Sequence, residues 1–136
     1  MIHSRHGDLT PEQLADALPG TGEVMRSVGH CHAMAWHAAR GGNWELAAYF
    51  LRRVRSLLRG LAVTRPKYAS QIAEFDRDHL ERAYQALISR DITQFEAAYS
   101  RTVDRANDYH VDTGHPYIRW SPPPEPPERG LDLTPG

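Results

Sequence analysis

The chain has 136 residues, of which 40% are hydrophobic and 24% are charged, and its formal net charge is −1 with the histidines counted as neutral. This composition is typical of one soluble globular domain. So small a net charge argues against nucleic acid and against an anionic membrane surface as partners. The single cysteine, Cys31, excludes an internal disulfide.

The first 21 residues are polar and contain one short predicted helix. Thr10 and Gln13 have the spacing of a capping box with Pro11 at the first helical position, which predicts a helix over residues 11–18. The segment lacks the apolar core of a secretory signal, and no apolar run in the chain reaches transmembrane length. We therefore expect a cytoplasmic protein with no membrane partner.

Four longer helices are predicted after this segment, each with an apolar stripe. The second is the clearest, because every third or fourth residue from Trp44 to Leu61 is apolar, which is the spacing of a bundle seam. Asn43 and Asp91 are N-cap residues for the second and fourth helices. The predicted helices span residues 22–40, 44–62, 66–89 and 92–113.

Helices of this length with short connections, and almost no strand signals, predict an all-α fold. The simplest arrangement is an antiparallel up-down-up-down four-helix bundle. Residues 1–21 are then an N-terminal segment with a short helix, residues 22–114 the bundle, and residues 115–136 an extended, proline-rich tail.

Two groups of polar residues are expected on the core faces of this bundle. His110 and Met25 are both placed about 6 Å below the end at which the first helix begins. His32 and Asp76 lie deeper, about 15 Å from the same end. A carboxylate beside an imidazole is typical of catalytic and metal-binding pairs, and equally of buried structural hydrogen bonds.

Cationic residues are predicted around the same end of the bundle. Arg65 and Lys67 begin the third helix there, and His115 and Arg119 follow the fourth. Such a rim favours an acidic ligand, because guanidinium and ammonium groups pair with carboxylates.

Four segments carry short motifs, NWELAAY at 43–49, RPKY at 65–68, DITQF at 91–95 and NDYH at 107–110 followed by GHPYI at 114–118. In this order they resemble a group of bacterial four-helix c-type cytochromes of the cytochrome c′-like kind, over roughly residues 22–120. In that family the last helix carries C-x-x-C-H, and the histidine is the proximal iron ligand. The resemblance therefore implies that His110 is a proximal heme ligand and the metal-binding residue.

The same frame departs from the family at two positions. Ala106 and Tyr109 stand where the family has its thioether cysteines, which excludes covalent heme c. The resemblance then implies noncovalent heme b, for which Ala106 leaves room and Tyr109 adds bulk to the pocket wall.

Three hypotheses stay open. The first is a heme b protein with His110 proximal and with Met25 and Val28 on an apolar distal side, for small-ligand binding or heme-assisted catalysis. The second is a cofactor-independent enzyme that uses the vacated heme cavity, with His32, Asp76 and His110 as acid-base groups. The third is a non-catalytic interaction protein that acts through its tail or through a homodimer face. The expected partner is heme or a small acidic molecule.

Overall fold

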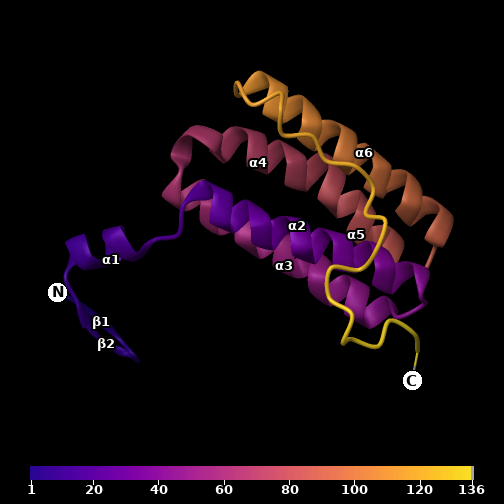
Figure 1. Ribbon diagram of the computed structural model, residues 1–136, viewed down its shortest axis with the longest axis horizontal. Coiled ribbons are helices and arrows are strands. Elements are labelled where there is room, and N and C mark those ends of the chain that lie inside the picture. The colour runs from indigo at the N-terminus through magenta and orange to yellow at the C-terminus, as the bar shows by residue number, and fades with distance from the viewer. Residues whose placement is uncertain (136) are drawn as a thin grey trace.

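The computed structural model describes residues 1–135, and it is mostly helical with one two-stranded sheet (Figure 1). The all-α prediction is therefore correct at the level of fold class. The elements in chain order are β1 (Ile2–Ser4), β2 (Gly7–Leu9), α1 (Pro11–Ala17), α2 (Thr21–Arg40), α3 (Trp44–Thr64), η1 (Pro66–Tyr68), α4 (Ala69–Phe75), η2 (Asp76–Leu80), α5 (Glu81–Ile88) and α6 (Ile92–Asp112).

Helices α2 and α3 pack along each other and form the largest helix–helix contact of the structure. The turn between them contains Gly42, whose φ of 86° lies in the left-handed region that favours glycine. Asn43 then caps α3 as predicted, since its Oδ1 accepts a hydrogen bond from the backbone N–H of Leu46 at 3.2 Å. The predicted seam of α3 is confirmed, because five of its residues are buried: Ala47, Leu51, Val54, Leu58 and Leu61.

Helix α6 begins at its predicted cap, where Asp91 accepts a hydrogen bond from the backbone N–H of Gln94 at 3.0 Å. It contacts α5 along its first half and η2 and α4 further on. The α2 start differs from prediction, because the N-cap is Gly20, with no side-chain hydrogen bond, and Thr21 is already helical.

The predicted continuous helix 66–89 is wrong in detail, because the segment is divided into η1, α4, η2 and α5. The η2 segment is π-helical, and a π turn takes up one more residue than an α turn. The inward face is consequently shifted by one position before η2. Phe75 faces the interior there, where the continuous pattern placed Asp76.

The N-terminal segment contains α1, as predicted, with the full capping box between Thr10 and Gln13. It also contains a hairpin, β1–β2, that the sequence did not indicate. The strands are three residues each and Gly7 has a φ of 135°, so only turn chemistry marks them. The hairpin and α1 lie apart from the longer helices in Figure 1.

The tail after α6 crosses the face of the molecule from α6 to α2 (Figure 1). Its backbone at Trp120 is bound by Asn107 of α6, and the Trp120 ring lies on Gly29 of α2. Further on, the Asn43 amide donates to the carbonyl of Asp132 at 3.1 Å. The tail is therefore attached to the helices at two places, at Trp120 and at Asp132.

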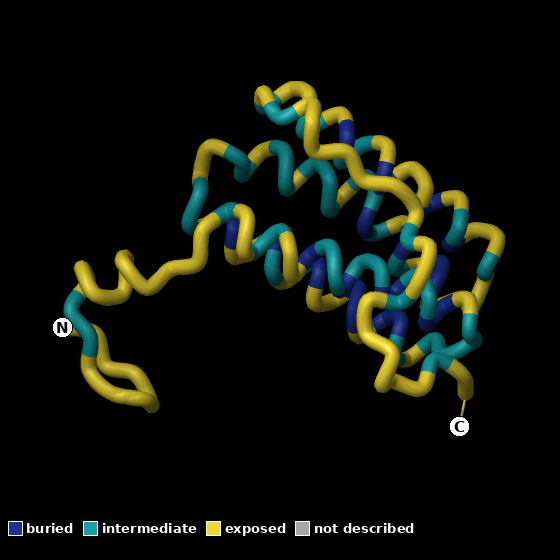
Figure 2. Tube along the Cα trace, in the orientation of Figure 1, coloured by how far each residue is buried: buried dark blue, intermediate teal, exposed yellow. Residues whose placement is uncertain are grey.

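Buried residues gather towards one end of the helices, where α2, α3, α5 and α6 meet (Figure 2). At the other end α4 has no buried residue. The helices are thus less tightly packed around α4, and the cavity described below occupies that region. Within residues 1–135, no helix is both long enough and apolar enough to cross a lipid bilayer.

Candidate functional site: a cavity beneath the C-terminal tail

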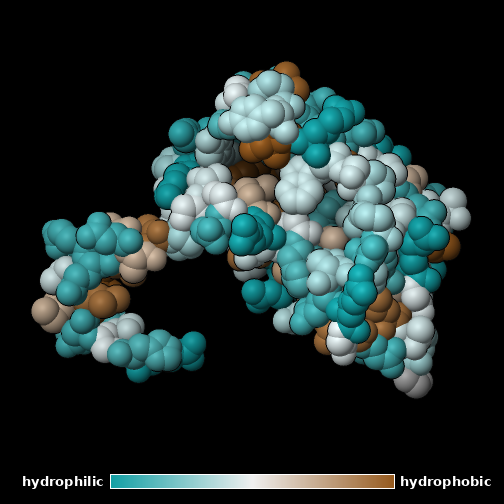
Figure 3. Space-filling view, in the orientation of Figure 1, coloured by the Kyte–Doolittle hydropathy of each residue, from teal (hydrophilic) through white to brown (hydrophobic). Residues whose placement is uncertain are grey.

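A cavity of about 640 Å³ lies between α2, α3, α4, α6 and the tail. This volume is within the range of cofactor and small-molecule sites. Its walls are mostly apolar, and apolar side chains show inside a hollow on the face drawn in Figure 3. Three histidines line it: His32, His110 and His115.

His110 is carried by the last turn of α6 and lines the cavity, as the sequence predicted. Its Nδ1 is buried and has no hydrogen-bond partner among the described residues. Burial lowers the pKa of His110, and a weaker backbone interaction with Ile118 opposes this effect. The imidazole is therefore neutral at neutral pH. Its Nε2 makes no hydrogen bond with a described residue and is available to a ligand.

The other predicted cofactor-binding residues divide into two groups. Met25, Val28, Ala106 and Tyr109 line the same cavity as His110. Arg65 and Lys67 do not line it: an Arg65 guanidinium nitrogen donates to the backbone carbonyl of Thr64 at 3.0 Å, and the Lys67 ammonium lies over the Tyr68 ring.

The cationic rim is accordingly smaller than predicted. Of the four basic residues assigned to it, only His115 and Arg119 line the cavity. Both belong to the tail, so the basic groups at the opening come from one side of it.

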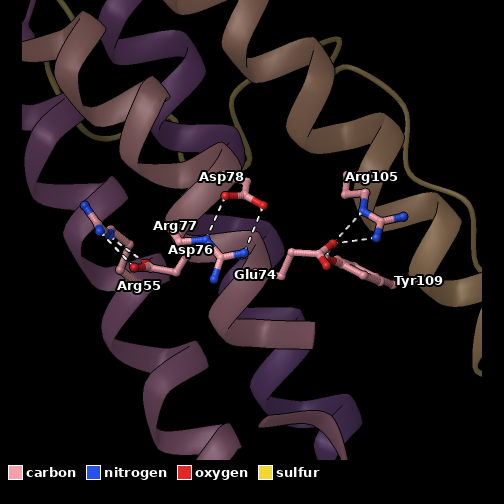
Figure 4. A network of polar contacts seen from close by, with 7 residues as sticks. All are labelled: Arg55, Glu74, Asp76, Arg77, Asp78, Arg105 and Tyr109. Atoms are coloured by element: carbon pink, nitrogen blue, oxygen red, sulfur yellow. Dashed lines mark hydrogen bonds and ion pairs between the residues drawn. The ribbon is translucent and has the colours of Figure 1, made fainter. Parts of the chain in front are cut away.

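Tyr109 is held by a polar network that the sequence did not indicate (Figure 4). Its hydroxyl donates to Oε1 of Glu74 on α4 at 2.5 Å, and Arg105 donates to the same oxygen. The Arg105 guanidinium carbon also lies 4.3 Å from the centroid of the Tyr109 ring. These bonds from Tyr109 and Arg105 lower the pKa of Glu74, while burial and the Glu74 bond raise the pKa of Tyr109 to about 12. Tyr109 and Arg105 thus tie α6 to α4 through Glu74.

His32 lies on α2 at the inner part of the cavity wall. Its ring stacks on Tyr99 with centroids 4.0 Å apart and planes 8° from parallel. Its Nε2 is 3.2 Å from Oγ1 of Thr102. Burial lowers the pKa of His32 to about 4, so this imidazole is also neutral at neutral pH.

The expected pairing of His32 with Asp76 is wrong. Both carboxylate oxygens of Asp76 accept hydrogen bonds from Arg55 of α3, at 2.7 and 2.9 Å (Figure 4). Arg55 also contacts Glu81 at 2.7 Å, and these bonds raise its pKa further. The shift of face caused by η2 is the physical reason, since it turns Asp76 towards α3 and places Phe75 at the cavity.

The tail forms a wall of the cavity that the sequence did not indicate. Asn107 binds Trp120 through both amide atoms, donating to its carbonyl at 2.9 Å and accepting from its N–H at 2.7 Å. A Cβ at Gly29 would lie 2.4 Å from the Trp120 ring, so the ring needs a glycine there. A glycine in the middle of a helix was the one available signal of this close approach.

Comparison with known proteins finds no match, whether among protein-family models, curated proteins or solved structures. Among residues 1–135, no three His, Cys, Asp or Glu side chains are grouped so that they could hold a metal ion.

Proposed function

We propose that the protein binds noncovalent heme b in the cavity beneath the tail, with His110 as the proximal iron ligand. In this proposal α2, α3, the α4–η2–α5 segment and α6 are the four helices of an up-down-up-down bundle of the cytochrome c′-like kind. The observation that carries it is a neutral imidazole, His110, whose Nε2 is unengaged on the wall of a cavity of about 640 Å³.

The residues present fit such a group. Met25 and Val28 supply apolar wall, and Ala106 leaves space where the family has a cysteine. Arg119 is the guanidinium on the wall that could pair with a propionate. A heme bound there would supply a redox-active iron with an open position for a small ligand. Cytoplasmic action remains part of the proposal, because the Ala106 and Tyr109 replacements leave no thioether bond to be made.

In this proposal the protein binds the heme and surrounds it with apolar walls. His110 remains neutral, which is the protonation state in which an imidazole nitrogen has a lone pair for a metal. In this proposal the ring lies on the cavity wall in the last turn of α6, with its Nδ1 buried and Nε2 as the nitrogen that would bind iron. The tail forms one wall of the cavity, through residues that include His115, Ile118 and Trp120.

Heme titration of the purified protein tests the proposal. We expect a saturable Soret band with one heme per chain, which is lost in His110→Ala. His32→Ala and His115→Ala are the matched controls, because both remove a cavity histidine and should leave the band in place. A band that survives His110→Ala, or the absence of any band in the unmodified protein, would refute the proposal.

The cofactor-independent enzyme is less well supported by the geometry. Two of its three acid-base groups, His32 and His110, share the cavity. The third, Asp76, is bound to Arg55 and is unavailable to orient either imidazole. Heme binding needs only one histidine, and for that reason we prefer it.

A further inference from the structure

The hydrogen bonds around His32 determine which of its ring nitrogens carries the proton. The Thr102 hydroxyl lies 2.6 Å from the backbone carbonyl of Tyr99, and the hydroxyl must be the donor because a carbonyl can only accept. A hydroxyl has one hydrogen, so Oγ1 can only accept from Nε2 of His32, 3.2 Å away. In neutral His32 the proton is therefore on Nε2, and Nδ1 has a lone pair.

That lone pair is not used within the protein. Nδ1 of His32 makes no hydrogen bond with a described residue. It is also not one of the buried polar atoms that lack a partner, so it is accessible to solvent. Since His32 lines the cavity, this nitrogen is open to it. Stacking on Tyr99 and the bond to Thr102 hold the ring in place, so the acceptor is fixed in direction as well as in tautomer.

We propose that Nδ1 of His32 is the hydrogen-bond acceptor of a second binding position in the cavity, which takes a neutral, largely apolar molecule with one O–H or N–H donor, such as a phenol. The His32 ring stacks on Tyr99, and the cavity that it lines has further apolar and aromatic walls, among them Val54, Phe75 and Val103. They favour an aromatic body, and the lone pair selects a donor at its polar end.

The same arrangement disfavours anions. A carboxylate is an acceptor and would place its charge against the His32 lone pair. His32 remains uncharged down to low pH, because burial lowers its pKa to about 4. Among the described residues, no cationic side chain forms a hydrogen bond or an ion pair with His32 or Thr102. The position therefore distinguishes a phenol from a benzoate, whereas the basic residues His115 and Arg119 lie on the tail side of the cavity.

This inference does not depend on heme, and its test uses the full-length, heme-free protein. Phenol, anisole and benzoate are titrated while the imidazole nitrogens are observed by NMR with ¹⁵N-labelled histidine. We expect His32 to show an unprotonated Nδ1 in the free protein and a shift of that nitrogen on saturation with phenol. Phenol should bind about tenfold more tightly than anisole or benzoate, because only phenol satisfies the acceptor.

Two variants separate the hydrogen bond from the shape of the cavity. His32→Phe should remove the preference for phenol over anisole. Thr102→Val keeps the side-chain shape but removes the acceptor of the Nε2 proton. The proton of His32 is then no longer fixed on Nε2, and the preference for phenol over anisole should fall. Thr113→Val is the matched control, since its hydroxyl also bonds a carbonyl of α6 on the cavity wall, at 2.8 Å, without contacting His32.

Helix content by circular dichroism verifies that each variant folds. The proposal is overturned if Nδ1 of His32 carries the proton in the free protein, if phenol does not bind, or if phenol and anisole bind equally. Heme binding is read from the Soret band in a separate titration, so failure of one proposal is distinguishable from failure of the other.

Discussion

Asn107 provides the sharpest test of how the tail closes the cavity. Its side chain is buried, at 9% exposure, and it makes two hydrogen bonds to the backbone of Trp120. Asn107→Ala removes both bonds without adding bulk. Trp120 is 39% exposed, so its freed N–H and carbonyl can be solvated once the tail moves.

The expected change in the free energy of tail detachment follows from the number of these hydrogen bonds and from the contacts that remain. A neutral hydrogen bond contributes about 1 kcal/mol net, and two bonds therefore about 2 kcal/mol. The Trp120 ring keeps its contact with Gly29, which holds part of the tail in place. We expect detachment of the tail to become easier by about 1–2 kcal/mol, so that the open population rises about 5–30-fold.

Hydrogen exchange at the Trp120 amide measures this population directly. In Asn107→Ala the exchange rate should rise by that factor, while amides in the buried part of α3 exchange as before. Asp108→Ala is the matched control, because Asp108 is the next residue of α6, is exposed and makes only a 3.8 Å contact with Arg105. Unchanged exchange at Trp120 in Asn107→Ala, or an equal rise in Asp108→Ala, would refute a tail held by Asn107.

Two further predictions concern stability and heme attachment. Unfolded His32 binds a proton near pH 6.5 and folded His32 only near pH 4, so the free energy of unfolding should decrease by about 3 kcal/mol as the pH falls through this window. Urea unfolding at several pH values should show this decrease, and the decrease should be about 3 kcal/mol smaller in His32→Gln; an identical decrease in the variant would contradict the assignment. If the cavity is a heme site, Ala106→Cys combined with Tyr109→Cys restores C-x-x-C-H, and the variant exported with a heme-attachment system should keep heme on a denaturing gel. If the double variant is exported folded but without heme, the cavity is not a heme site. Tyr109→Cys alone is the control, because it restores only one of the two cysteines.

The amphipathic stripes and the caps were sufficient to predict the long helices. Asn43 and Asp91 cap as expected, and the seam from Ala47 to Leu61 is buried. The caps depend on local hydrogen bonds and the seam on helix periodicity, and both can be predicted from the order of the residues. The same periodicity placed His110, Met25 and Val28 at one cavity.

What could not be predicted depends on a change of period or on distant contacts. The π segment at Asp76 shifts the inward face by one residue, and a constant period of 3.6 residues cannot represent this. Asp76 therefore bonds to Arg55 and not to His32. The contacts of Trp120 with Gly29 and Asn107 join segments far apart in the chain, and only the folded structure brings them together.

Four side chains in the turn of α6 from Ala106 to His110 line the cavity or hold its walls. Ala106 leaves space at the cavity, Asn107 binds the tail, and Tyr109 bonds to Glu74 of α4. His110 adds the imidazole. Two sets of hydrogen bonds, from Asn107 to the tail and from Tyr109 to Glu74, thus hold α4, α6 and the tail around one cavity. These contacts join α6 to α4 and to the tail without a covalent link. A wall held by hydrogen bonds can open and close again, and both proposed ligands, noncovalent heme and a phenol-like molecule, would need such an opening to enter the cavity.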